Sequence, residues 1–160
     1  MKLLILTQYF PPEIGAPQNR LYELALRLQK KGVEVSVLTA MPNYPQMKIH
    51  ENYKGKCYCK ETLNELKIHR AWIYVSQSES IISRLLNYFS FVITAFFVGA
   101  FKFKKQDVLM VESPPLFLGI TAYLLAKLKG AKLLFNVSDL WPESAEKLGI
   151  ITNKTLLSMA

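Results

Sequence analysis

Short apolar runs alternate along the chain with stretches in which apolar residues recur every three or four positions. The runs cover residues 3–6, 33–40, 68–75, 108–111 and 133–137, and their length and flanking loops are typical of strands. Helical spacing over residues 17–31 and 116–129 predicts amphipathic helices between them. This alternation predicts an α/β fold: a Rossmann-like, doubly wound, mostly parallel sheet with helices on both faces.

Proline and glycine mark the predicted boundaries. Pro17 stands near the start of the first helix, and Gly32 and Gly130 follow the ends of the two helices. Residues 46–65 are polar and irregular, so we expect a long excursion with an extended piece near Cys57. Residues 142–149 predict a short helix, and residues 152–160 predict the start of another.

Residues 80–105 contain an uncharged stretch of seventeen residues between Arg84 and Lys102, which is at the short limit for a membrane span. Three polar residues interrupt it: Asn87, Ser90 and Thr94. Because the segment separates two strands of one predicted sheet, we expect a crossover helix rather than a span. An apolar helix can still expose one side to lipid, and the basic tail of this segment (Lys102, Lys104 and Lys105) would suit an anionic membrane.

The composition fits one domain and favours an anionic partner. The 160 residues are 51% hydrophobic and carry a net charge of +8. Nucleic acid, anionic lipid and a phosphorylated substrate are all compatible with this charge, but no nucleic-acid-reading motif occurs, so we expect no nucleic acid. Cys57 and Cys59 are expected to be reduced thiols of a cytosolic protein, with a metal pair as the alternative. The apolar stretch at residues 3–6 is too short for a signal peptide.

Candidate chemistry gathers where the predicted strands end. If the strand order is 3-2-1-4-5, the loops after the first and fourth strands flank a crevice at the carboxyl edge of the sheet. In the first loop, Gly15 would let a phosphate approach a helix N-terminus, or would simply make a turn. Arg20 could contact that phosphate, or be a solvated surface residue.

Two carboxylates lie at adjacent strand ends. Glu112 and Asp139 could accept hydrogen bonds from sugar hydroxyls or take a proton from one, and capping of the following helices is the alternative. The aromatic rings of Tyr44 and Trp141 could stack on a sugar, or pack at the rim.

Two common classes of nucleotide-binding enzyme are disfavoured. The chain has no G-x-G-x-x-G, and residues 39–41 provide no acid for a ribose, which disfavours a nicotinamide dehydrogenase. It has no G-x-x-x-x-G-K-[ST] either, which excludes a P-loop NTPase.

Four segments together resemble a known family. They are Thr-Gln-Tyr-Phe-Pro-Pro-Glu at residues 7–13 with Gly-Ala-Pro at 15–17, Leu-Thr-Ala-Met-Pro-Asn-Tyr-Pro at 38–45, Glu-Ser-Pro-Pro-Leu-Phe at 112–117, and Ser-Asp-Leu-Trp-Pro-Glu-Ser at 138–144. Through them the whole chain resembles the N-terminal half of a family 4 glycosyltransferase of GT-B fold. It is similar to the bacterial enzymes of O-antigen, capsule and colanic acid biosynthesis. Among these, it most resembles the group that includes N-acetyl-fucosamine transferases.

The resemblance implies a division of labour. Residues 1–160 would form the N-terminal, acceptor-side domain, truncated before a C-terminal domain that binds the nucleotide-sugar donor through an E-x7-E motif. The whole enzyme would transfer a sugar to a lipid-linked or glycan acceptor with retention of anomeric configuration. It would need no essential metal or other cofactor, and would work in the cytoplasm, peripherally at the inner face of the cell membrane. The chain alone is expected to be inactive, which a comparison of sugar transfer with the full-length parent would test.

The resemblance also places the loop at Gly15 against the donor diphosphate. From their places in the sequence, we expect Arg20 to bind the same diphosphate and Glu112 and Asp139 to be catalytic. Many relatives carry a histidine that touches the donor sugar where this chain has Glu112 and Ser113, so that contact is missing here. The acceptor-binding candidates are Tyr9, Asn43, Tyr44, Ser113 and Trp141. The alternatives are a non-enzymatic flavodoxin-like or nucleotide-binding module and a small membrane-associated interaction domain.

Overall fold

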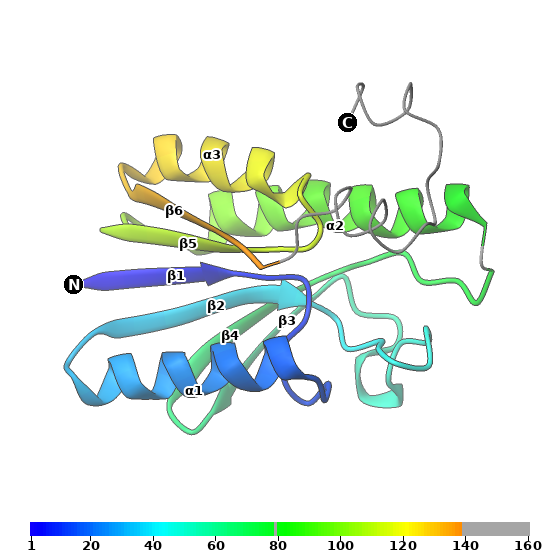
Figure 1. The fold of residues 1–160 in the computed structure, drawn as a ribbon, viewed down its shortest axis with the longest axis horizontal. Helices are drawn as coiled ribbons and strands as arrows, with labels where there is room; N and C mark the ends of the chain where they lie inside the picture. Colours follow the sequence, from blue (N-terminus) through cyan, green and yellow to red (C-terminus); the bar gives the residue numbers. More distant parts are fainter. Residues whose placement is uncertain (79, 139–160) are drawn as a thin grey trace.

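The structure, a computed structural model, describes residues 1–78 and 80–138. Six strands form one sheet that carries helices on both faces (Figure 1). The strands are β1 (Lys2–Leu6), β2 (Glu34–Ala40), β3 (Tyr58–Leu63), β4 (Leu66–Ala71), β5 (Val108–Ser113) and β6 (Lys132–Val137). The helices are α1 (Ala16–Lys30), α2 (Ile81–Lys102), α3 (Leu118–Lys129) and the 3-10 turn η1 (Glu51–Tyr53). The predicted Rossmann-like α/β fold is confirmed.

The strand order is β3-β4-β2-β1-β5-β6, and every neighbouring pair is parallel except β3 with β4. The predicted order of the five parallel strands is therefore confirmed, with the reversal between β1 and β5. The extended piece expected near Cys57 is confirmed as β3, so residues 46–65 are only partly irregular. Asn64 and Glu65 both have positive φ (45° and 67°) and turn β3 back onto β4.

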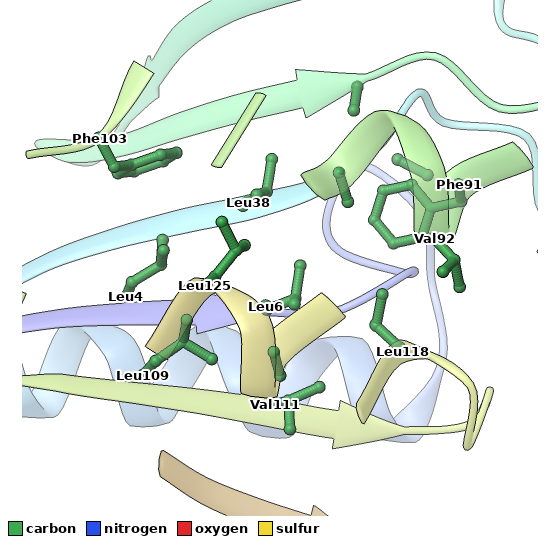
Figure 2. Close-up of a cluster of buried hydrophobic side chains, with 14 of the residues drawn as sticks. Leu4, Leu6, Leu38, Phe91, Val92, Phe103, Leu109, Val111, Leu118 and Leu125 are labelled. Carbon is green, nitrogen blue, oxygen red and sulfur yellow. The ribbon is translucent and has the colours of Figure 1, made fainter. Parts of the chain in front are cut away.

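The central strand is buried on both faces, as its unbroken apolar run predicts. Leu4 and Leu6 belong to the larger core cluster, which also includes residues of α2 and α3 (Figure 2). Leu3 and Ile5 belong to a second cluster with residues of α1. In Figure 1, α1 accordingly covers one face of the sheet while α2 and α3 cover the other.

Polar residues of α2 hold it along the segment that follows β4. Asn87 Nδ2 donates to the Tyr74 carbonyl at 2.6 Å, Ser90 Oγ accepts from the Tyr74 N–H at 2.8 Å, and Thr94 Oγ1 donates to the Trp72 carbonyl at 2.5 Å. The helix connects β4 to β5 and packs on the sheet, as expected for a crossover. The described residues contain one helix long and apolar enough to cross a membrane, and it is α2.

Among the predicted elements, one strand differs from its prediction, and two helices lie outside the described residues. The apolar run at residues 133–137 suggests a buried strand, but β6 lies at the sheet edge, and Leu133, Leu134, Phe135 and Val137 are exposed there. An edge strand has a neighbour on one side only, which leaves its side chains less covered. The helices predicted over 142–149 and 152–160 lie outside the described residues.

Candidate functional site

Unpartnered polar atoms gather at the carboxyl edge of the sheet. Four buried side-chain oxygens have no hydrogen-bond partner among the described residues: Gln8 Oε1, Gln18 Oε1, Asn43 Oδ1 and Ser113 Oγ. They come from the loops after β1 and β2, from the first turn of α1 and from the end of β5. Buried polar groups are normally paired, so such a group of open atoms indicates a place where water or a ligand completes the bonding.

Glu112 is the centre of a polar cluster at this edge. It is buried near the end of strand β5, where its Oε1 is paired with the Arg20 guanidinium and accepts from Ser138 Oγ. Its Oε2 accepts from Asn136 Nδ2 at 2.7 Å. The sequence pattern did not indicate Asn136 or Ser138 as site residues. They come from β6 and the residue after it, so only the pairing of β5 with β6 brings them to Glu112.

Arg20 connects this buried cluster to the solvent-exposed surface. Its side chain is 53% exposed, and its Nη2 also donates to Ser138 Oγ at 2.9 Å. A guanidinium has five N–H donors, so an arginine held by one carboxylate still has donors free for a second anion. Arg20 is the fifth residue of α1 rather than part of its first turn. Glu112 and Ser138 hold the guanidinium in place, which distinguishes Arg20 from a surface arginine that contacts only solvent.

Gly15 is the N-cap of α1, but its backbone is extended (φ −179°), a conformation that any residue adopts. The reason for glycine is steric, because a Cβ at this position would lie 2.4 Å from Gln18 Oε1. The amide of Gln18 therefore packs against the bare Gly15 backbone. Gly15 and Glu112 both lie at the carboxyl edge, joined through Arg20 of the same helix, while Asp139 and Trp141 lie outside the described residues.

Glu13 is a buried acid that sequence reasoning missed. Its Oε1 accepts the backbone N–H groups of Asn43 and Tyr44 at 2.8 and 2.9 Å, and its Oε2 accepts that of Phe10 at 3.2 Å. Burial raises the pKa of its carboxyl, and the three N–H groups partly oppose this. One side chain thus joins the loop after β1 to the loop after β2. The acid following Pro-Pro was the available signal.

Arg70 of β4 lies beneath the same loops and is fully buried. Its Nε donates to Glu61 Oε1 at 2.6 Å, its Nη1 to the Ala40 carbonyl at 3.2 Å, and its Nη2 to the Pro11 carbonyl. It therefore links β3, the end of β2 and the loop after β1. A charge inside the apolar pattern of a strand was its only signal.

The two tyrosines predicted to bind the acceptor are neighbours. The rings of Tyr9 and Tyr44 meet edge to face, with centroids 5.8 Å apart. Burial raises the pKa of the Tyr9 hydroxyl, which accepts from Gln8 Nε2 at 3.1 Å and stays neutral. Tyr44 is exposed. Asn43 and Ser113 are buried, and each has a side-chain oxygen without a hydrogen-bond partner among the described residues. Four of the five predicted acceptor residues therefore lie at the same edge.

A groove of about 470 Å³ opens farther along this edge. The loop after β2 contributes residues 47–49, and the segment after β4 contributes residues 72–77. Its two aromatic residues, Trp72 and Tyr74, are 41% and 36% exposed. Exposed aromatic rings beside polar groups suit the faces and hydroxyls of a sugar. Sequence reasoning did not single out these two residues.

No cluster suited to a metal is found in the described part of the chain, where no three His, Cys, Asp or Glu side chains group together. Cys57 is exposed and Cys59 is half-buried, and both are free thiols.

Fold and site together define a Rossmann-like α/β protein with a cluster of polar side chains at the carboxyl edge of its parallel strands. The chain is 32% identical over 151 residues to the colanic acid biosynthesis glycosyl transferase WcaI of Escherichia coli (strain K12). This match covers 94% of the chain and 37% of WcaI, so the chain spans little more than a third of that relative's length. No model of a known protein family matches. The predicted resemblance to a glycosyltransferase of the colanic acid type is confirmed.

Proposed function

We propose that the full-length product of this gene is a glycosyltransferase of cell-surface polysaccharide biosynthesis. It transfers a sugar from a nucleotide-sugar donor to a lipid-linked glycan acceptor, with retention of configuration. The similarity to WcaI over nearly the whole chain is the observation that carries this proposal. The open polar oxygens at the carboxyl edge support it, because that edge is where ligands bind in open α/β sheets.

Arg20 has the chemistry to bind the donor diphosphate. A diphosphate leaving group gains negative charge as the glycosidic bond breaks, and a fixed guanidinium stabilises that charge. Glu112 keeps Arg20 in place by ion pairing, with Ser138 and Asn136 completing its bonding. In this proposal Glu112 acts by positioning Arg20. Proton transfer by Glu112 or Asp139 stays a separate prediction.

The acceptor binds along the same edge. Tyr44, at the exposed rim, and the open oxygens of Asn43 and Ser113 offer stacking and hydrogen bonds to sugar hydroxyls. The groove beside Trp72 and Tyr74 offers a second aromatic surface for a further sugar of the acceptor. The donor nucleotide is held by a C-terminal domain, no essential metal takes part, and the enzyme works peripherally at the cytoplasmic face of the membrane.

The experiment measures sugar transfer by the full-length protein and its variants. Arg20→Ala should lower kcat/KM about 100-fold, the loss typical of removing one donor to a developing charge. Glu112→Ala should cause a similar loss, and the double variant should lose little more, because both act through the same guanidinium.

Arg27→Ala is the matched control. Arg27 lies on the outer side of the same helix, pairs with Glu23, and is well exposed. Its removal should leave kcat/KM unchanged. Equal activity of Arg20→Ala and Arg27→Ala would contradict the proposed role of the cluster.

A further inference from the structure

Helices α2 and α3 pack closely enough to form one surface. A Cβ on Gly99 of α2 would lie 2.4 Å from Leu125 Cδ1 of α3, so the glycine permits the close approach. Thr121 Oγ1 donates to the Val92 carbonyl at 2.7 Å, and Lys129 Nζ donates to the Ala100 and Phe103 carbonyls at 2.6 Å. Figure 1 shows the two helices side by side over the same face of the sheet.

The outer side of this pair is apolar. We call it the α2–α3 face, and its exposed members recur at helical spacing on both helices. The most exposed are Phe101 at 80%, Ile81 at 76% and Ile82 at 71%. The remaining members are Leu85, Leu86, Phe89, Ile93, Phe97, Leu116, Phe117, Ile120, Tyr123, Leu124 and Leu128. An apolar surface that extends over two helices is larger than the scattered exposed residues of ordinary soluble proteins, and it marks an interaction site.

Within the two described segments that carry this face, residues 80–106 and 113–138, every charged side chain is positive. Residues 80–106 and 113–138 contain no Asp or Glu. Their charged residues are Arg84, Lys102, Lys104, Lys105, Lys127, Lys129 and Lys132. By contrast, α1 on the other side of the sheet pairs Glu23 with Arg27 on its surface. Exposed apolar residues on segments whose charges are all positive complement a membrane surface, which has an apolar interior and anionic headgroups.

We infer that the α2–α3 face binds the surface of an anionic lipid bilayer, with both helices lying along the membrane. The polar side of α2 holds the segment after β4 through Asn87, Ser90 and Thr94, so the helix keeps that side on the protein. A second copy of the chain is a poorer occupant, because two such faces would bring like charges together. This surface is separate from the Glu112 cluster. The inference rests on the proposed work of the enzyme at the membrane, and it names the face that would make the contact.

Vesicle co-sedimentation of the full-length protein tests this inference. Vesicles of phosphatidylglycerol and phosphatidylcholine should sediment most of the protein, and pure phosphatidylcholine should sediment at least five times less. Added salt should weaken the binding, since exposed charges are screened within about 10 Å at 0.1 M. Phe97→Ser/Phe101→Ser and Lys104→Glu/Lys105→Glu should each reduce the sedimented fraction at least fivefold. These four residues are exposed, so the fold should survive.

The control is Lys30→Glu/Lys31→Glu, which makes the same charge change at the end of α1, away from the face. It should bind vesicles like the wild type. Equal binding of the two lysine variants, or no preference for anionic vesicles, would overturn the inference. The inference would also be overturned if another part of the protein covered the face, which would show as no vesicle binding. It would likewise be overturned if a second copy covered it, which would show as a dimer that Phe97→Ser/Phe101→Ser dissociates. Transfer to a water-soluble acceptor analogue should continue in all these variants, which separates this test from that of the proposed function.

Discussion

Two buried charged side chains at the carboxyl edge, Glu13 and Arg70, hold the loops after β1 and β2. Glu13 reaches three backbone N–H groups, and Arg70 reaches two backbone carbonyls and a carboxylate. Their partners are mostly backbone atoms, which have no sequence signature. This is why reasoning from residue types found the exposed candidates, such as Tyr44 and Arg20, and missed the residues that position the loops.

Glu13 provides the test at this scale. Glu13→Ala would leave three backbone N–H groups without an acceptor, so the free energy of unfolding should fall by about 3 kcal/mol. Glu13→Gln keeps one carbonyl oxygen and should lose less. Urea denaturation measures both. Glu23→Ala, an exposed acid on α1, should change the free energy by no more than about 0.5 kcal/mol. Equal stability of Glu13→Ala and Glu23→Ala would refute the positioning role.

At the scale of elements, burial on both faces made the parallel strands easy to predict. Without such burial, β3 could be predicted only as an extended piece near Cys57, without its bounds or its pairing. Leu3 to Leu6 form an unbroken apolar run because each face of β1 meets a core. The residues of β3 are polar or partly buried, so no run marks it. The sheet then joins β3 to β4, and this pairing places Tyr58 Oη 2.8 Å from His69 Nδ1.

His69 makes this junction sensitive to acid. Burial is the main cause that lowers its pKa to about 4, and the nearby lysines Lys60, Lys102 and Lys67 add to it. The unfolded chain takes up the proton near pH 6.5 and the folded chain does not, so stability should fall as pH drops from about 6.5 to 4. The loss should reach roughly 2 to 3 kcal/mol.

Unfolding by urea across this pH range measures the effect. His69→Gln should flatten the fall, whereas His50→Gln, which removes the other imidazole of the chain, should retain it. A fall that is equally steep in His69→Gln would assign the acid sensitivity to other groups.

For the whole molecule, the sheet order and the edge that carries the site could be predicted, since strand order in such sheets determines where loops converge. The cluster of Glu112 with Asn136 and Ser138 could not, because it depends on register between strands that are far apart in sequence. The steric reason for Gly15 likewise needed the position of the Gln18 side chain. Prediction was thus reliable for backbone topology and weaker for the contacts that topology creates.

The central claim is that the carboxyl edge of the sheet serves sugar transfer from a nucleotide sugar to a lipid-linked acceptor. The most direct measurement is a screen of nucleotide-sugar donors with the full-length protein and a lipid-diphosphate acceptor, following labelled sugar into the lipid fraction. We predict transfer from one donor or a small group of related donors, with retained anomeric configuration and no added metal. Absence of transfer from every donor, by folded protein that still binds a nucleotide, would contradict the account and favour a non-enzymatic nucleotide-binding module.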